Sequence, residues 1–387
     1  MKIYKAYKFR LYPSNEQKHY LNTNFGCTRF VYNHYLNKKE DYYKKYKKNL
    51  SLKEMKHDLS INLKVKHPWL RECDSMALFS ALDNLDRAYT NFFEKRADKP
   101  KFKYKGGRDS YKTNCIRGMY KGHFYENIKV DIKNKLIKLP KMGYVPIKGY
   151  RGLVAFPWKI LSVTLSREAN KYYVSVLVEQ EVKEENIKVK SAIGLDLGIK
   201  DLVISADGMK YKRLDISRIE KRIKGLQKHS ARCVPHSNNS LKIKNKISRA
   251  YMKMKNMRKY YIHEITKNIV NNNDLIAVET LDIKNMIQSG KETKLSKYIN
   301  YASWNTLINT LKYKCKWNNK VLVNIHKYYA SSQICNVCGH KNKEVKDLSI
   351  REYRCTNCKS ELDRDINASI NILWRGINKY YRTEVIS

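Results

Sequence analysis

The stretch CNVCGHKNKEVKDLSIREYRCTNCKSELDRDINASINIL, residues 335–373, decides how the C-terminal half of this chain is organised. It begins with two C-x-x-C pairs and ends in NASINIL, whose apolar spacing predicts the start of a helix. Asp365, at the predicted helix start, follows the last cysteine, Cys358, by only seven positions. A free-standing metal ribbon has no need of such a neighbour, whereas a ribbon inserted into a larger domain would lie beside one.

The four cysteines of this stretch have the spacing of a zinc site. They form two C-x-x-C pairs with 16 residues between the pairs: Cys335, Cys338, Cys355 and Cys358. Two tight turns of this kind bring four thiolates into a tetrahedron, and such closed coordination indicates a structural Zn²⁺, because a catalytic zinc keeps an open position. His340 lies close by but is left out, since four thiolates fill the tetrahedron. The alternative is a chance pairing of buried or redox-active thiols.

The location of the protein is predicted by what the sequence lacks. The N-terminus, MKIYKAYKFRLYPSNEQ, has no apolar signal core, and no run of 18 apolar residues occurs. We therefore expect a cytoplasmic, nucleoid-associated protein, and a composition rich in Lys, Asn, Ile and Tyr suggests a bacterial host with an AT-rich genome. In a reducing compartment a disulfide framework is not expected. The five other cysteines are interpreted as buried small apolar side chains: Cys27, Cys73, Cys115, Cys233 and Cys315.

The net charge points to a polyanionic partner. The chain of 387 residues has 79 Lys and Arg against 36 Asp and Glu, a formal charge of +43. Self-repulsion of this size destabilises a compact protein unless a polyanion screens it. DNA or RNA is the natural partner, because neutralised phosphates release counterions. The basic residues are spread along the whole chain, whereas a membrane-surface protein would concentrate them on one amphipathic helix.

The N-terminal half is predicted to contain a β-rich and a helical part. Residues 2–11 alternate apolar and basic side chains, which is typical of a half-buried strand. Ser14 and Gln17 form a capping-box pattern that predicts a helix start. Helices are expected through 15–98, and the clearest one, at 75–96, has apolar residues near one face: Leu78, Leu82, Leu85, Tyr89, Phe92 and Phe93.

The next segment, 113–182, is β-like, with a hairpin around Glu168–Asn170, and the charged stretch 182–190 is interpreted as a linker. The expected domains are a β-rich one made of 1–12 and 113–190 and a helical one made of 13–112. The order that follows is a strand–turn–strand at 191–208, Lys-rich helices near 214–232 and 240–271, a buried strand at 273–283, a helix near 302–318 and a strand at 321–329. This order predicts a mixed α/β layer domain over 191–387, and the zinc ribbon occupies 331–360 within this range.

Three acidic residues lie at the ends of predicted elements of this last domain: Asp196 in IGLDLG, Glu279 in AVET and Asp365 in DRDINAS. Phosphodiester hydrolysis by two divalent metals needs acidic ligands that converge from different segments. Gly194 and Gly198 are expected to let a metal or phosphate approach Asp196. Each acid has a simpler interpretation: a turn residue for Asp196, a surface strand end for Glu279 and a helix N-cap for Asp365.

With these residues in view, the chain resembles the transposon-encoded TnpB nucleases, relatives of the type V CRISPR effectors. The resemblance is carried by GLDLG, AVETL, and SSQICNVCG with YRCTNC and DRDINASINI. It also covers KAYKFRLYPSNEQK and CTRFVYNHYL near the N-terminus, and PKFK at 100–103, so it spans nearly the whole chain. The resemblance implies an RNase H-like (RuvC) mixed-sheet nuclease domain with an inserted zinc ribbon. Before it come a β-barrel-like (wedge) lobe and a helical recognition lobe.

Site residues follow from the resemblance residue by residue. Asp196, Glu279 and Asp365 are implied to be the catalytic carboxylates that bind two Mg²⁺ ions, with Asp363 as the fallback for the third ligand. The chain departs from the family pattern at Lys359, where a Gly often follows the last cysteine, and at Ser369, where a second Ala is frequent.

The function implied by the resemblance is RNA-guided, metal-dependent cutting of double-stranded DNA next to a short adjacent motif. The partners would be a guide RNA and the target DNA. Two alternatives stay open: a transposase or recombinase that uses the same acids for strand transfer without RNA, and a nucleic-acid-binding repressor whose acids are vestigial.

Overall fold

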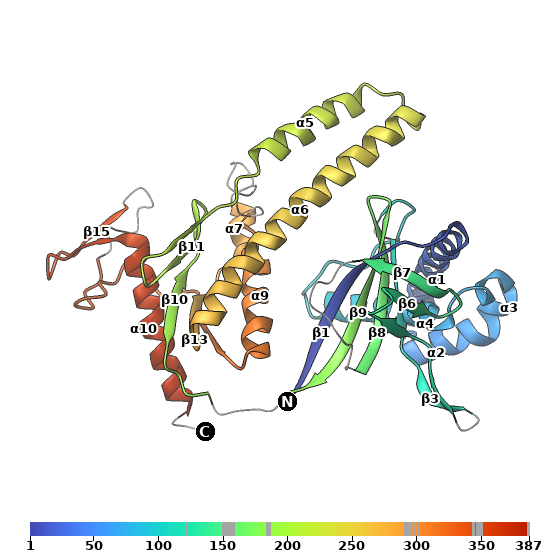
Figure 1. The fold of residues 1–387 in the computed structure, drawn as a ribbon, viewed down its shortest axis with the longest axis horizontal. Coiled ribbons are helices and arrows are strands. Elements are labelled where there is room, and N and C mark those ends of the chain that lie inside the picture. Colours follow the sequence, from blue (N-terminus) through green and yellow to red (C-terminus); the bar gives the residue numbers. More distant parts are fainter. Residues whose placement is uncertain are drawn as a thin grey trace. The chain divides into compact units, whose positions relative to one another are not determined.

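The computed structural model describes residues 1–107, 109–120, 123–148, 159–182, 187–289, 296, 299, 302–342, 345 and 351–384. It divides into two compact units, Met1–Val182 and Lys183–Ser387 (Figure 1). Within the described ranges, no helix is both long enough and apolar enough to cross a membrane. Part of the expected linker, 183–186, lies outside the described residues.

The helices of the N-terminal unit follow a first strand. The elements are β1 (Lys2–Leu11), α1 (Asn15–Tyr46), α2 (Leu52–Asp58), η1 (Leu59–Leu63), α3 (Lys64–Lys66), η2 (Pro68–Arg71) and α4 (Ser75–Phe93). The capping box at Ser14 and Gln17 is present at the start of α1, as predicted. The predicted apolar face of α4 is wrong at one position: Phe93, the last residue of the helix, is 69% exposed.

A seven-stranded antiparallel sheet forms the rest of this unit, in the order β2-β8-β9-β1-β7-β6-β5. Its other strands are β2 (Asp109–Asn114), β5 (Lys129–Asp131), β6 (Leu136–Leu139), β7 (Gly143–Lys148), β8 (Lys159–Glu168) and β9 (Lys171–Glu181), and β3 (Arg117–Tyr120) pairs with β4 (His123–Glu126) as a separate hairpin. Tyr111 of β2 and Val130 of β5 pack in one core although their strands are the two edges, so the sheet curls around that core. The predicted hairpin turns at Ala169 and Asn170, which both have positive φ.

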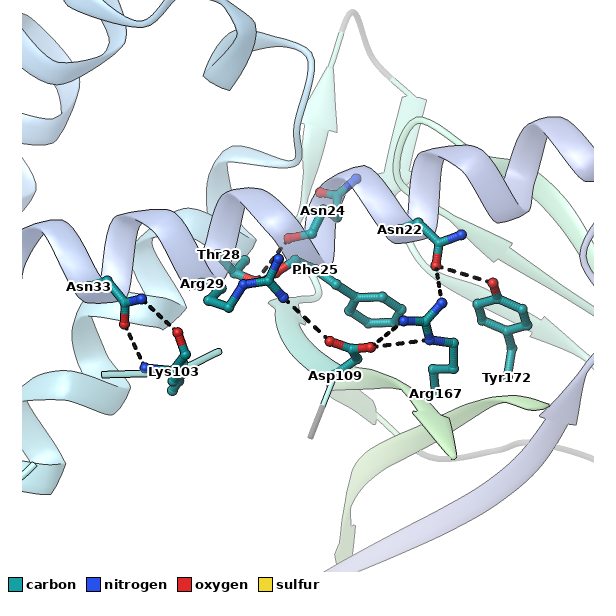
Figure 2. A network of polar contacts seen from close by, with 10 residues as sticks. All are labelled: Asn22, Asn24, Phe25, Thr28, Arg29, Asn33, Lys103, Asp109, Arg167 and Tyr172. Atoms are coloured by element: carbon teal, nitrogen blue, oxygen red, sulfur yellow. Dashed lines mark hydrogen bonds and ion pairs between the residues drawn. The ribbon is translucent and has the colours of Figure 1, made fainter. Parts of the chain in front are cut away.

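A polar network fastens α1 to this sheet (Figure 2). Asp109, buried at the start of β2, accepts hydrogen bonds from Arg167 of β8 and pairs with Arg29 of α1. Arg167 also donates to the Asn22 side chain at 3.1 Å, and the Tyr172 hydroxyl donates to the same oxygen. Since β2 begins at Asp109, the second stretch of strands in this sheet begins four residues before the predicted boundary at 113.

The C-terminal unit is built on a mixed five-stranded sheet in the order β12-β11-β10-β13-β14. Its strands are β10 (Ala192–Asp196), β11 (Asp201–Ser205), β12 (Lys210–Lys212), β13 (Leu275–Glu279) and β14 (Val321–Ile325). The pairs β10–β13 and β13–β14 are parallel, whereas β11 is antiparallel to both of its neighbours. The last predicted strand is shorter than 321–329, because a turn closed by the Tyr329 N–H and the His326 carbonyl follows β14.

Helices surround this sheet: α5 (Ser217–Ala231), α6 (Asn238–Asn272), α7 (Ile283–Ser289), α9 (Trp304–Trp317) and α10 (Arg364–Glu384). The first two form a long antiparallel hairpin that extends beyond the sheet of this unit (Figure 1). The expectation for isolated cysteines holds for Cys27, Cys73 and Cys315, which are buried. It is wrong for Cys115 and Cys233, which are partly exposed because they lie beside a hairpin and in the turn between α5 and α6.

Helix α10 packs directly across β10, and glycine makes this possible. A Cβ atom added at Gly194 would collide with the backbone of Ser369 and Leu373 of α10. At Gly198 it would collide with the Asp201 carbonyl. The prediction that a glycine leaves room for a metal or phosphate is therefore wrong at Gly194, because the backbone of α10 occupies that space, whereas Gly198 lines the cavity that contains Asp196. The close approach instead brings the first turn of α10 to the end of β10.

Candidate active site and zinc ribbon

Three carboxylates from three elements line one cavity of about 1070 Å³ in the C-terminal unit. Asp196 is the last residue of β10 and Glu279 is the last residue of β13. These strands are parallel neighbours, with Leu195 opposite Val278, so both acids leave the sheet at the same edge. Asp365 reaches this edge from the first turn of α10.

The cavity favours a bound cation. Burial raises the pKa of Asp196 well above its usual value, and the charges of Glu279 and Asp365 raise it further. Burial also raises the pKa of Glu279, although its Oε1 accepts a hydrogen bond from the Leu197 N–H at 3.3 Å. Because adjacent carboxylates in a closed site resist ionising together, a positive ion that lets both ionise would bind strongly.

The two aspartates of the DRD segment occupy different positions. Asp363 is the N-cap of α10, since its Oδ1 accepts from the backbone N–H groups of Asp365 at 3.0 Å and Ile366 at 3.1 Å. Its other carboxylate oxygen pairs with Lys210 at 2.5 Å. The Asp365 side chain lines the cavity, and Asp363 is not among the lining residues. The N-cap role considered for Asp365 therefore belongs to Asp363.

Sequence reasoning missed the basic residues that line the same cavity: Lys200, Lys212, Arg213, Arg258, Arg351 and Arg364. Arg351 precedes the second cysteine pair, and its guanidinium lies 3.7 Å from a carboxylate oxygen of Asp365. The Arg351 side chain is 66% exposed, so this ion pair is weak and Arg351 can instead bind another anion. The sequence offered no signal for Arg351 beyond one more positive charge in a basic chain.

The donor set of the cavity suits hard divalent ions. Carboxylate oxygens are the ligands that Mg²⁺ prefers, and it needs only one or two of them beside water and phosphate oxygens. In the described part of the chain, the only set of three or more possible ligand atoms that all lie within 4.8 Å of one another is formed by cysteines.

The cysteine set is the ribbon site predicted from the sequence. Cys335 Sγ lies 3.7 Å from Cys358 Sγ, and Cys338 Sγ lies 3.5 Å from Cys355 Sγ. Four thiolates about 2.3 Å from a tetrahedral Zn²⁺ would lie about 3.8 Å apart, so the geometry fits a structural zinc and is too long for disulfides. A hydrogen bond from the Ser360 hydroxyl lowers the pKa of Cys358 to about 6, which favours the thiolate that a metal needs.

The two turns of the ribbon repeat the same backbone pattern. The residue after each cysteine pair, Gly339 and Lys359, has positive φ, and its N–H donates to the carbonyl of the first cysteine of that pair. Lys359 therefore stands at a position that favours glycine for its backbone conformation.

The ribbon is joined to α10 by asparagines two and six residues beyond Asp365. The Asn367 side chain accepts from the Asn336 N–H at 2.9 Å and donates to the Ile334 carbonyl at 2.8 Å. Asn371 donates to the Ile334 carbonyl as well. Both asparagines are buried, so these bonds are protected from water. This arrangement explains why the ribbon and the acid are neighbours in the sequence: the ribbon steadies the helix turn that carries Asp365.

Comparisons with known proteins match three parts of the chain to family descriptions. Residues 304–372 match "Cas12f1-like, TNB domain", residues 175–290 match "Probable transposase" and residues 1–48 match "Helix-turn-helix domain". The last description does not fit the local structure, because residues 1–48 form β1 followed by the single helix α1.

Full-length relatives are found among bacterial proteins. The chain is 30% identical to "Putative RNA-guided DNA endonuclease InsQ" of Escherichia coli K12, over 97% of this chain and 93% of that protein. It is also 30% identical to "Putative RNA-guided DNA endonuclease" of Streptomyces pristinaespiralis, over 97% and 90%. Among solved structures, the fold resembles Cas12f1 in a complex with sgRNA and target DNA, with a TM-score of 0.60, 14% identity and coverage of 96% of this chain and 98% of that one.

Proposed function

The chain belongs to the TnpB family of RNA-guided DNA endonucleases, and from this premise we propose that Asp196, Glu279 and Asp365 form its catalytic site. The single observation that carries the proposal is their convergence, from β10, β13 and α10, in one cavity that six basic residues also line. The three acids come from distant segments of the chain and meet in this cavity. Residues with only local roles, in a turn or as a helix cap, would not be expected to converge.

Two Mg²⁺ ions held by the three carboxylates would activate a water molecule and stabilise the leaving oxygen of the cut strand. The chain's own residues have three further tasks in this site. Asp363 holds the first turn of α10 by capping it, which keeps Asp365 in place. Arg351, which pairs loosely with Asp365, is positioned to contact the phosphate that is cut. The ribbon, with a structural Zn²⁺ at its four cysteines, would keep Arg351 and Asp365 in position.

Sequence specificity in an RNA-guided enzyme comes from base pairing, while the protein supplies cationic contacts to the backbone. We infer that the β-rich part, 1–12 and 113–190, and the helical part, 13–112, act as wedge-like and recognition lobes that read a short DNA motif next to the target. The charge of +43 supports a structured RNA as a permanent partner.

The test begins with the protein expressed together with its flanking DNA, so that any bound RNA can be sequenced. The purified complex is then incubated with Mg²⁺ and a library of randomised targets. We expect one defined RNA with a variable 3′ segment and Mg²⁺-dependent cutting of matching DNA only. Asp196→Ala should remove cutting and leave RNA and DNA binding intact, whereas Glu361→Gln, which removes an exposed acid of the ribbon, should leave both unchanged. Heterogeneous RNA and no matched cutting would overturn the proposal.

The match to "Probable transposase" supports one rival, in which the same carboxylates transfer strands without RNA. The products distinguish the two: a transposase yields joined DNA, and the proposed nuclease yields broken ends. A repressor with vestigial acids would bind DNA equally well before and after Asp196→Ala, and neither protein would cut.

A further inference from the structure

A second cavity, of about 780 Å³, is lined by residues of both α5 and α6. Its apolar floor comes from the small core of the hairpin: Ile216, Ile219, Leu226, Ala250 and Met257. Its rims are basic. We call this cavity the hairpin groove, and the five cations that line it are Arg218, Arg222, Lys246, Arg249 and Lys253.

The five cations are arranged on two facing edges. Arg218 and Arg222 lie one turn apart on α5, and Lys246, Arg249 and Lys253 follow at intervals of three and four on α6, which places each set on one helix face. All five are exposed, and among the described residues none of their side chains makes a hydrogen bond or ion pair.

The hairpin as a whole has an extreme charge balance. Residues 217–259 contain 14 Lys and Arg and a single acid, Glu220. The one acid that lines the groove, Asp215, already accepts a hydrogen bond from the Ser217 N–H at 2.9 Å, at the start of α5. Like charges one turn apart destabilise a helix. A ligand of opposite charge in the groove would relieve this repulsion.

The groove adjoins the carboxylate cavity, because Asp215 and Ile216 line both. From Lys246 to Lys253 the rim runs about 10 Å along α6, which corresponds to roughly three phosphates of one strand. Directly packed helices have axes about 8–10 Å apart, so the seam is too narrow for a double helix, whose major groove alone is about 12 Å wide. The shape therefore fits a single strand.

We propose that the hairpin groove binds the sugar–phosphate backbone of the single DNA strand that is about to be cut, and leads it to Asp196, Glu279 and Asp365. The cations contact phosphates without reading sequence, and the apolar floor contacts sugars and base faces. This inference rests on the proposed function, and it names the path by which the substrate reaches that site. A segment of the guide RNA is the other available polyanion, but the wall shared with the carboxylate cavity favours the strand that reacts there.

Two triple variants with equal loss of charge test the groove. The groove variant is Arg222→Gln, Arg249→Gln and Lys253→Gln; the control is Lys221→Gln, Lys224→Gln and Lys242→Gln, which lie on the same helices outside the groove. We expect the groove variant to cut guide-matched DNA about tenfold more slowly. The slope of log K against log salt for its binding of single-stranded DNA should fall by about two, because each lost phosphate contact on a single strand contributes about 0.7. The control should stay within about twofold, and both should bind guide RNA like the wild type.

A photo-cross-linking experiment tests the same groove without requiring the DNA to be cut. In the Asp196→Ala background, Arg222→p-benzoylphenylalanine should form photo-cross-links to the DNA strand and not to the guide RNA. Equal effects of both triple variants, absence of DNA cross-links, or cross-links to RNA with loss of RNA binding would each overturn the inference. If Asp196→Ala still cuts while DNA cross-links form, the groove assignment stands and the carboxylate assignment fails.

Discussion

At the scale of single residues, neighbouring side chains of the same type have unlike tasks. Asp363 and Asp365 are two positions apart, yet the first caps α10 and pairs with Lys210, and the second enters the carboxylate cavity. The difference arises because Asp363 lies just before the helix, where its side chain accepts from the first free backbone N–H groups. Asp365 lies within the first turn, so its side chain points away from the helix axis.

This difference predicts opposite outcomes for one substitution at the two positions. Asp365→Asn should slow DNA cutting on the order of 10²–10³-fold, the loss typical for one preorganised electrostatic group. Asp363→Asn keeps a good N-cap and should change the cutting rate only a few-fold. Single-turnover cutting rates and melting temperatures of both variants provide the measurement. If Asp363→Asn were the inactive variant, the third ligand would be Asp363.

A second residue-scale prediction concerns Asp274, just before β13. Lys320 lowers the pKa of Asp274 below its usual value, and the backbone N–H groups of Lys190 and Ser191 lower it further. Because this pKa is lower in the folded chain than in the unfolded chain, the carboxylate stabilises the fold above about pH 4, and the effect is lost as the pH falls through the folded value.

We therefore expect Asp274→Asn to lower the free energy of unfolding by about 1 to 2 kcal/mol at pH 7, a figure discounted for partial exposure to solvent. The difference from the wild type should shrink as the pH falls below about 4. Urea unfolding of both proteins at several pH values measures this. A difference that stays constant down to pH 3 would contradict the assigned cause.

At the scale of elements, the zinc ribbon and α10 act together. The ribbon supplies Arg351 to the carboxylate cavity, and its Asn336 N–H donates to Asn367 of the helix. On the sheet side of α10, Gly194 of β10 contributes as well, since only glycine lets α10 approach β10 so closely. An apparently separate metal module thus forms part of the wall of the carboxylate cavity.

Removal of the zinc should therefore slow DNA cutting, although the cysteines themselves do not line the carboxylate cavity. Cys355→Ser should lower the zinc content below one ion per chain, loosen the ribbon and reduce DNA cutting roughly 10- to 100-fold, the size seen when an outer support of a site is lost. Cys233→Ser, in the turn after α5, is the control and should keep its zinc. Zinc stoichiometry and cutting rates are the readouts. Full cutting by a zinc-free protein would show that the ribbon does not support α10.

At the scale of the whole molecule, charge governs behaviour. With a net +43 the chain repels itself, and a bound polyanion adds its binding energy to the stability of the folded state. Proteins of this kind are best understood as one component of a ribonucleoprotein.

We expect the free protein to be poorly soluble and its melting temperature to rise when its RNA is bound. The rise should shrink steadily as salt is increased from 50 to 500 mM, because counterion release drives the binding. Thermal scans with and without RNA across this range measure the effect. A rise independent of salt would mean that charge is not its source.

The sequence by itself determined the features that depend on short-range spacing and composition. The alternation of residues 2–11, the capping box at Ser14, the strand pattern around Asp196 and the two cysteine pairs each follow from local periods or fixed intervals, and the net charge needs only counting. The three acids at the ends of predicted elements were also visible in the sequence, and the family resemblance added the catalytic role expected of them.

Only the tertiary structure decided which side chains face one another. It separated the roles of Asp363 and Asp365, found Arg351 beside the acids, filled the space above Gly194 with α10 and placed Phe93 in solvent. It also joined the hairpin groove to the carboxylate cavity through Asp215 and Ile216. These contacts join residues far apart in the chain, and no local period encodes them, because they depend on how complete elements pack and at what distance.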